Sequence, residues 1–410
     1  MIIIHVVTDL PRLITPNLEE RLRVMPAVVL TGARQTGKST LAKMLDAKGR
    51  RFLSLDDLDV MDAAQRDPEI LLGGDQPVTL DEVQRVPSLL LAVKRSIDRR
   101  RSRGRFLLTG SANLLLMRRV SESLAGRASY LTLWPMTRRE QLGTGRGGVW
   151  EDLIETPDEN WRDLLASQKE GPEDWRPLAK RGGFPTPAVH LHGDRERSIW
   201  FDGYVRTYLE RDLQDLSSIE NLPEFRRLMQ AACHRLGQLL NQTELGRDVA
   251  LPQPTVRRYL NLLETSYLLL RLPAYSVNRT KRLIKSPKLY WGDTGIALHL
   301  SGADPDGPHL ENLVLQDILA WRDGRIERSE VFYWRTTTGQ EVDFVIESKA
   351  RLLPIEVKAS SRVHLGDTAD LRSFRAEYGK KARAGLLLYT GDVTEWLAPD
   401  VLAVPWWKVI

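Results

Sequence analysis

Residues 28–40 read Val-Val-Leu-Thr-Gly-Ala-Arg-Gln-Thr-Gly-Lys-Ser-Thr, an apolar strand followed by a glycine-rich loop and the start of a helix. Glycines allow the backbone N–H groups of such a loop to surround phosphate oxygens, and the N-terminus of the next helix attracts an anion. Lys38 would reach the terminal phosphates and assist catalysis, and the hydroxyl of Ser39 suits Mg²⁺. A plain glycine turn would not need these two residues, so the stretch predicts a site for ATP. The predicted nucleotide contacts are Gly32, Ala33, Arg34, Gln35, Thr36, Gly37, Lys38, Ser39 and Thr40.

A second acidic strand end lies downstream, where residues 77–80 form a short apolar strand that runs into Asp81-Glu82. In phosphoryl-transfer sites the first carboxylate of such a pair holds Mg²⁺ and the second polarises the attacking water. We therefore predict Asp81 as a metal ligand together with Ser39, and Glu82 as the catalytic base. An acidic pair is otherwise common in solvated loops, but beside the glycine-rich loop the catalytic interpretation is favoured.

Two further residues are candidates for the same chemistry. The strand of residues 105–108 is followed by Ser111, which would orient water or sense the terminal phosphate, although the same stretch also suits a helix cap. Arg127 is a candidate arginine finger, a cation supplied to a neighbouring subunit or domain to stabilise charge on the transferring phosphoryl group. An ordinary surface arginine is the equally weighted alternative for Arg127.

Length, charge and cysteine content set the broad class of the protein. A chain of 410 residues is long enough for two or three domains. The net charge of +5 is compatible with a polyanionic partner without requiring one. Cys233 is the only cysteine, which excludes an intrachain disulfide, and no Cys/His cluster has zinc spacing. The sequence contains no apolar run long enough to cross a bilayer, so we expect a soluble protein of the cytoplasm without a membrane partner.

The first part of the chain alternates strands and helices, which predicts an α/β fold with a parallel sheet covered on both faces. Ligands of such sheets gather at the carboxyl ends of the strands. From about residue 143 to 173 the periodicity is weak, and we interpret this segment as a lid or an insertion. The expected strands are residues 28–30, 51–55, 78–80, 106–108 and 130–133.

Residues 225–300 have the pattern of a winged helix. We expect helices at 236–240, 243–249 and 254–265, then a strand at 267–272, a basic loop at 278–288 and a return strand at 289–291. A third helix in the major groove, with a basic wing on phosphate, predicts DNA as a partner through Arg257, Arg258 and the basic wing. Winged helices also dock proteins, so a protein partner stays open.

A second chemical site is predicted near the C-terminus. Because strand side chains alternate, Glu356 and Lys358 share one face of their strand, and Asp343 converges on them if its own strand pairs alongside. Two carboxylates can hold Mg²⁺ against a scissile phosphate, while Lys358 orients or deprotonates water. Glu311, which begins a predicted helix, would complete the metal shell. Charged residues that alternate along an exposed sheet face would give the same sequence pattern as a nuclease site, so nuclease activity stays open.

Taken together, the chain resembles a family of bacterial and archaeal AAA-type ATPases. In that family a C-terminal domain of unknown function combines a winged helix with a restriction-endonuclease-like fold. The resemblance rests on nine ordered motifs: residues 31–40, Leu80-Asp81-Glu82-Val83-Gln84, Leu108-Thr109-Gly110-Ser111, Leu124-Ala125-Gly126-Arg127, Gly182-Gly183-Phe184-Pro185, residues 290–295, Glu311-Asn312-Leu313-Val314, Glu341-Val342-Asp343-Phe344 and Ile355-Glu356-Val357-Lys358.

The resemblance implies an AAA-like strand order, self-association into a homo-oligomer, and a nuclease-like site of Glu311, Asp343, Glu356 and Lys358. Val342 stands where the nuclease motif often has proline, and the lid shows no clear sensor arginine. We expect a P-loop ATPase domain at 1–140, a lid or helical linker at 141–222, a winged-helix domain at 223–302 and a restriction-endonuclease-like domain at 303–410.

The preferred function is that of an ATP-hydrolysing protein that couples nucleotide state to DNA binding, with a Mg²⁺-dependent nuclease site whose activity is open. The alternative is a nucleotide-controlled protein- or DNA-binding module with an inactive nuclease-like domain. A small-molecule phosphotransferase is disfavoured because Asp81-Glu82 suits the activation of water and the rest of the chain shows no acceptor pocket.

Overall fold

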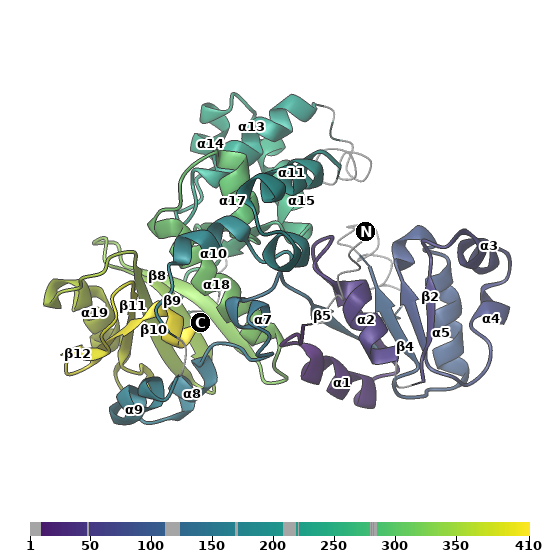
Figure 1. The fold of residues 1–410 in the computed structure, drawn as a ribbon, viewed down its shortest axis with the longest axis horizontal. Helices are drawn as coiled ribbons and strands as arrows, with labels where there is room; N and C mark the ends of the chain where they lie inside the picture. Colours follow the sequence, from purple (N-terminus) through teal and green to yellow (C-terminus); the bar gives the residue numbers. More distant parts are fainter. Residues whose placement is uncertain are drawn as a thin grey trace. The chain divides into compact units, whose positions relative to one another are not determined.

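The computed structural model of the chain divides into two compact units, residues 1–146 and 147–410 (Figure 1). It describes residues 10–46, 49–110, 124–168, 171–207, 219, 221–278, 280, 282 and 285–410. Within these ranges no helix is both long and apolar enough to traverse a lipid bilayer.

The first unit is built on a five-stranded parallel sheet in the order β2-β3-β4-β1-β5. This confirms the predicted α/β fold. β4 separates β1, which leads into the glycine-rich loop, from β3, which ends in the acidic pair. The chain leaves β1 for the edge strand β2 and then returns across the sheet until β5 pairs on the other side of β1. Ligands of such sheets bind at the carboxyl ends of the strands, where the glycine-rich loop after β1 lies. The strands are β1 (Ala27–Thr31), β2 (Arg51–Ser54), β3 (Val78–Asp81), β4 (Phe106–Thr109) and β5 (Ala128–Thr132).

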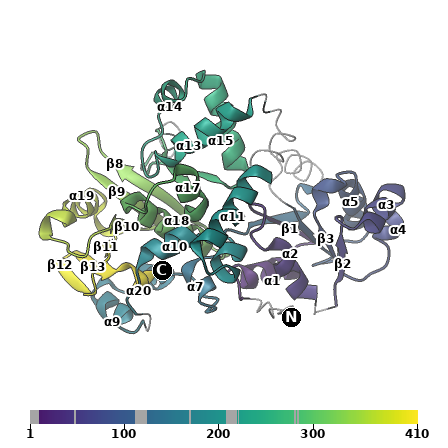
Figure 2. The same cartoon turned by 45° about the horizontal axis from the view of Figure 1, so that its top comes forward.

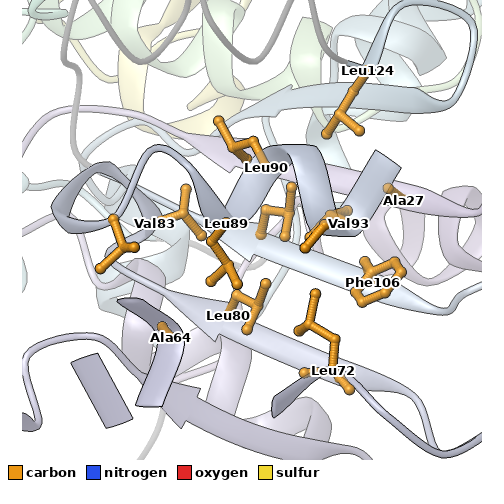
Figure 3. Packing of buried hydrophobic residues seen from close by; sticks show 14 of the residues in the cluster. Ala27, Ala64, Leu72, Leu80, Val83, Leu89, Leu90, Val93, Phe106 and Leu124 are labelled. Atoms are coloured by element: carbon orange, nitrogen blue, oxygen red, sulfur yellow. The ribbon is translucent and has the colours of Figure 1, made fainter. Parts of the chain in front are cut away.

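Helices cover both faces of this sheet because its strands are apolar on both sides. Ala27 and Val29 of β1 contribute to one core, whereas Val28 and Leu30 contribute to the other. The first core is packed by α5 and also contains Phe106 (Figure 3). The helices are α1 (Thr15–Val24) and α2 (Lys38–Asp46) on one face, and α3 (Leu58–Arg66), α4 (Pro68–Leu71) and α5 (Leu89–Arg99) on the other, with the short α7 (Arg138–Gln141) near the end of the unit.

The second unit begins with helices and a two-stranded sheet. Residues 236–240, predicted as helical, instead form turns and one isolated bridge between Leu239 and Lys288, because Leu239 pairs with the strand that follows the basic loop. The winged-helix assignment stays a prediction.

The helices and strands of this first half of the second unit are α8 (Trp150–Glu155), α9 (Trp161–Ala166), α10 (Trp175–Arg181), α11 (Asp194–Tyr204), α13 (Leu222–Cys233), α14 (Gln242–Asp248), α15 (Gln253–Thr265), antiparallel β6 (Leu269–Leu272) and β7 (Lys288–Trp291), and α17 (Thr294–Ser301).

The C-terminal part of this unit is a six-stranded sheet in the order β12-β13-β11-β10-β9-β8. β9 and β10 pair antiparallel as expected, with Ile355 opposite Phe344. Helix α19 packs on β9, β10 and β11, and α18 packs on β8 and β10 (Figure 2). The elements are α18 (Gly307–Asp323), β8 (Ser329–Arg335), β9 (Glu341–Ser348), β10 (Arg351–Lys358), α19 (Ala369–Tyr378), β11 (Gly385–Tyr389), β12 (Glu395–Ala398), β13 (Val401–Pro405) and α20 (Trp406–Val409).

The segment that we interpreted as a lid or an insertion belongs to the packing of this sheet. Trp161 is fully buried and stacks on Trp396 of β12, with ring centroids 6.5 Å apart. Arg383 pairs with Asp158 at 2.9 Å and lies over the Trp161 ring. The described part of this segment therefore contains two short helices, each anchored by a buried tryptophan. The assignment as a lid stays a prediction.

Two motifs far apart in the sequence meet in the second unit. The backbone N–H of Gly183 donates to Asp293 Oδ2 at 2.6 Å, and Asp293 also caps α17 through Ile296 N at 3.0 Å. Gly182 has φ +66°, and a Cβ there would lie 2.5 Å from Asp293 Oδ1, so the turn accepts only glycine. Burial raises the pKa of Asp293 to about 6, even though backbone donors oppose that shift.

The apolar core of the first unit yields a stability prediction. Phe106 is fully buried, so Phe106→Ala should lower the free energy of local unfolding of this unit by about 3–5 kcal/mol. Ile70, which is 78% exposed, serves as the control, and Ile70→Ala should change that free energy by about 0.5 kcal/mol or less. Amide hydrogen exchange of β1 and β4 measures both values. Equal exchange in the two variants would contradict this account of the core.

Candidate nucleotide site and acidic cluster

The glycine-rich loop follows β1 and has a backbone that requires its glycines. Gly32 and Gly37 have φ +141° and +93°. A Cβ on Gly32 would lie 2.3 Å from the carbonyl oxygen of Leu133, so any side chain would displace the loop from β5. Gln35 also adopts a left-handed φ, of 64°. The loop therefore holds its shape through backbone geometry that few sequences permit.

Lys38 begins α2 and is only 5% exposed. Its Nζ donates to the carbonyl oxygens of Ala33 at 2.7 Å and Gly32 at 3.2 Å. Burial lowers the pKa of Lys38 to about 8, although the carboxylates of Glu82 and Asp81 oppose the shift. The ammonium is thus held by neutral oxygens of its own loop, next to two acids and at the carboxyl edge of the sheet.

Asp81 ends β3 and meets the loop. Ser39 Oγ donates to Asp81 Oδ1 at 2.8 Å, and Thr109 Oγ1 of β4 donates to the same oxygen. A hydroxyl and a carboxylate oxygen are ligands that Mg²⁺ accepts, so this pair fits the metal that the fold implies. The predicted partners Ser39 and Asp81 therefore lie together. The bond from Thr109 to Asp81 was not predicted, because it depends on β4 lying next to β3 in the sheet.

Glu82 follows in an unusual backbone conformation. Its φ is 57°, in the left-handed region that non-glycine residues seldom adopt. Burial raises the pKa of the Glu82 carboxyl, and Gln84 Nε2 donates to Glu82 Oε2. A carboxylate with a raised pKa is a better proton acceptor. The conformation and the burial are both typical of residues at functional sites.

Arg12 supports the loop, a role that we did not predict. Its guanidinium donates to the carbonyl oxygens of Thr36 at 2.8 Å and Trp134 at 2.7 Å, and to Glu140 Oε1 at 3.1 Å. Arg12 is 7% exposed, so these bonds form in a low-dielectric setting and fix the loop firmly. Arg12 lies ahead of the first helix and belongs to no sequence motif, so no signal in the sequence points to these contacts.

The remaining two candidates for ATP chemistry are placed differently. Ser111 lies outside the described residues. Arg127 precedes β5, at the amino edge of the sheet and opposite the glycine-rich loop. It forms a two-bond pair with Asp98, at 2.6 and 3.0 Å. Arg127 is therefore remote from the loop of its own unit, and a role toward a neighbouring subunit stays a prediction.

The structure brings the four predicted residues of the second site together. Asp343 Oδ2 accepts from Val357 N at 3.0 Å, and Lys358 Nζ donates to Glu356 Oε1 at 2.7 Å. Glu311 on α18 accepts from the Tyr290 hydroxyl at 3.1 Å. Burial and the Asp343 charge raise the pKa of Glu356 to about 8 and the pKa of Glu311 well above its usual value. We call Glu311, Glu341, Asp343, Glu356, Lys288 and Lys358 the acidic cluster.

Lys288 of β7 lies inside this cluster, where we had placed it on an exposed basic wing. Its side chain is 3% exposed, and Nζ lies 2.5 Å from Glu341 Oε1 and 3.1 Å from Asp343 Oδ1. Burial alone would lower the pKa of Lys288, but Asp343, Glu311 and Glu341 raise it above its usual value.

The predicted metal shell of Glu311, Asp343 and Glu356 is not formed in this arrangement. Among the residues that the structure describes, no three histidine, cysteine, aspartate or glutamate side chains are arranged to hold a metal ion. In this arrangement the Lys288 ammonium takes the position between Asp343 and Glu341, so of the three predicted ligands Asp343 is already paired with a cation. Metal binding by Glu311, Asp343 and Glu356 stays a prediction.

The basic wing needs a second correction. Arg282 is 8% exposed and bonds Glu347 at 2.7 Å, with its guanidinium over the Phe332 ring. It faces inward because the chain after β6 pairs with β8, where Tyr275 N donates to Tyr333 O at 2.6 Å. Arg279 and Lys281 lie outside the described residues, and Lys285 is exposed.

A polar groove of about 980 Å³ lies beside α15 and the antiparallel pair of β6 and β7. Gln253, Arg257 and Asn261 line it at four-residue spacing, which puts them on one face of α15. Among the described residues its charged lining groups are arginines, and Arg258, next to Arg257, is not among them. The groove is lined by Leu239, Leu240, Asn241, Gln242, Thr243, Gln253, Pro254, Arg257, Asn261, Arg271 and Ser286.

Comparison with known proteins matches this architecture. Residues 25–142 match the model of an AAA domain. Residues 172–307 and 306–409 match two domains of unknown function, DUF8612 and DUF4143. The domain boundaries expected from the sequence stay predictions.

Two bacterial proteins are similar to this chain in sequence. An uncharacterized protein of Mycobacterium tuberculosis, Rv2008c, is 30% identical over 401 residues, which cover 95% of this chain and 82% of the relative. One of Haemophilus influenzae is 21% identical over 305 residues, with 73% and 68% covered. The solved Walker-type ATPase PABY2304 of Pyrococcus abyssi is 15% identical, and the match covers 70% of this chain and 94% of the solved chain at a TM-score of 0.43. The chain belongs to the same family as the mycobacterial protein, and it combines an AAA-type ATPase domain with a C-terminal DUF4143 domain.

Proposed function

We propose that this protein binds ATP and hydrolyses it to ADP and phosphate at the loop of residues 32–39. The observation that carries the proposal is the 2.8 Å contact between Ser39 Oγ and Asp81 Oδ1, beside the buried Lys38. It brings a cation for phosphate and two oxygen ligands for Mg²⁺ to one edge of the sheet. The match of residues 25–142 to an AAA domain supports the same assignment.

Each residue has a separate task in this proposal. Lys38 exchanges its hydrogen bonds to the neutral carbonyl oxygens of Gly32 and Ala33 for bonds to the terminal phosphates. Ser39 and Asp81 would hold Mg²⁺, which offsets phosphate charge when bound. Glu82 accepts the proton of the attacking water, and Gln84 fixes one oxygen of that carboxylate. Arg127 would act only on the site of a neighbouring copy.

We further propose that nucleotide state is coupled to the binding of duplex DNA in the polar groove. The groove lining joins two arginines with the carboxamides of Gln253 and Asn261, and contains no carboxylate among the described residues. Arginine suits phosphate and guanine, and carboxamides suit adenine. The alternative is that the groove binds a segment of a protein. A groove for a protein segment would be expected to have a more apolar lining than these arginines and carboxamides.

The nuclease part of the predicted function receives no support from the geometry. Of the acids that were expected to hold Mg²⁺, Asp343 is paired with the Lys288 ammonium at 3.1 Å. We therefore propose the alternative form of the function, in which the C-terminal sheet is nuclease-like in its residues but does not cut DNA.

Substitutions in the loop test the ATPase proposal. Lys38→Ala should abolish tight ATP binding because it removes the buried cation, whereas Lys43→Ala, exposed on the same helix, should bind as the parent does. Glu82→Gln should bind ATP but turn it over about 10²–10⁴-fold more slowly. Calorimetry measures binding and phosphate release measures turnover. ADP release that depends on a small-molecule acceptor would contradict the proposal.

Neighbouring arginines on α15 test the groove. Arg257→Ala should weaken binding of duplex DNA about 5- to 150-fold, which corresponds to about 1–3 kcal/mol. Arg258→Ala removes the same charge one residue outside the groove lining and should change affinity much less. Fluorescence anisotropy at fixed salt compares the two variants. Equal losses of DNA affinity in the two variants would mean that the positive charge of the surface, and not the groove, attracts DNA. If neither variant lost affinity, a protein partner would be favoured.

A further inference from the structure

The acidic cluster contains a buried cation of its own, the ammonium of Lys288, which lies between two carboxylates. Lys288 Nζ lies 2.5 Å from Glu341 Oε1 and 3.1 Å from Asp343 Oδ1, and Lys288 also lies over the Tyr333 ring at 5.9 Å. The two carboxylate oxygens thus converge on one point that is shielded from solvent. Oxygens that converge in this way are what a divalent cation requires.

A second observation shows that the cluster has unused capacity. Glu356 is 8% exposed, and its Oε2 finds no hydrogen-bond donor among the described residues. A buried carboxyl oxygen without a partner costs free energy, so Glu356 could supply one further oxygen to a cation that took the place of Lys288. Lys358 satisfies only the other oxygen, Oε1, at 2.7 Å.

We propose that the Lys288 ammonium is the resident cation of the acidic cluster, and that it excludes a divalent metal from the position between Asp343 and Glu341. The parent protein then binds no divalent metal through Asp343. Removing the ammonium leaves converging carboxylates without a counter-charge and converts the cluster into a metal site. The inference does not depend on ATP hydrolysis, because every residue in it belongs to the second unit.

The matched comparison is between the two lysines of the cluster. Lys288 is 3% exposed and touches Asp343, whereas the Lys358 side chain is 39% exposed and bonds Glu356. Lys288→Met keeps the length and apolar stem of the side chain and removes its charge. Lys358→Met makes the same change where the ammonium can be replaced by water. Only the first variant should create a site.

The experiment is a Mn²⁺ titration of the full chain without nucleotide, followed by calorimetry and by the Mn²⁺ paramagnetic resonance signal. All proteins carry Asp81→Asn, which removes the carboxylate of the nucleotide site. We expect Lys288→Met to gain one Mn²⁺ site, with affinity at least about tenfold above the background binding of the parent, equivalent to about 1.4 kcal/mol. Lys358→Met should gain none, and Lys288→Met with Asp343→Asn should lose the new site.

Three results would overturn the proposal. The first is a Lys288→Met protein with parent-like near-ultraviolet circular dichroism and no new Mn²⁺ site. The second is an equal gain in Lys358→Met. The third needs only the parent and its Asp343→Asn variant: if the parent binds Mn²⁺ and Asp343→Asn loses that binding, the metal fits beside Lys288. This comparison keeps the proposal testable if Lys288→Met does not fold, and Lys288→Gln supplies a second neutral side chain.

Discussion

A parallel sheet that is covered by helices on both faces binds its ligands at the carboxyl ends of its strands, and the first unit depends on that constraint. The strand order places β4 between β1 and β3, so Thr109 can reach Asp81 while the loop after β1 supplies Ser39. The opposite edge of the same sheet holds Arg127 in a pair with Asp98. One edge therefore concentrates groups suited to phosphate and metal, and the other holds a satisfied surface ion pair. Both faces of the sheet are occupied by helices, which leaves this edge as the place for chemistry.

Two buried lysines show how their partners decide what a buried charge does. Lys38 is held by backbone carbonyls, and its pKa falls to about 8 because burial outweighs the nearby acids. Lys288 is held by carboxylates, and its pKa rises because those charges outweigh burial. Neutral partners are exchanged cheaply for a phosphate, whereas a paired buried charge is costly to separate. The first lysine is suited to meet a ligand, and the second is suited to stay in place.

Local motifs made the nucleotide site predictable, because its contacts come from residues close in sequence or at successive strand ends. The spacing of residues 32–39 and the acids after β3 were enough to predict the meeting of Ser39 and Asp81. Arg12 was not predictable, since it reaches Glu140 across 128 positions and belongs to no motif. Ser111 cannot be compared, because it lies outside the described residues.

The acidic cluster was predictable only in part, for a related reason. Strand alternation correctly brought Asp343, Glu356 and Lys358 to one place. A run of basic residues does not reveal which of them turn inward, so Lys288 and Arg282 were assigned to a surface wing. Their direction is set by the pairing of the chain after β6 with β8, which brings Glu341 and Glu347 of β9 within reach. That pairing is a tertiary contact without a local signal.

The short segment of residues 286–288, which leads into β7, joins the polar groove to the acidic cluster. Ser286 lines the groove, and its carbonyl oxygen accepts from the Tyr333 hydroxyl of β8. Lys288 follows two residues later and enters the acidic cluster. The carbonyl oxygen of Pro287, between them, accepts from Leu240 N at 2.8 Å, and Leu240 lines the groove as well. A ligand that displaced this short segment would have to break a buried ion pair, so the cluster gives the groove a rigid wall.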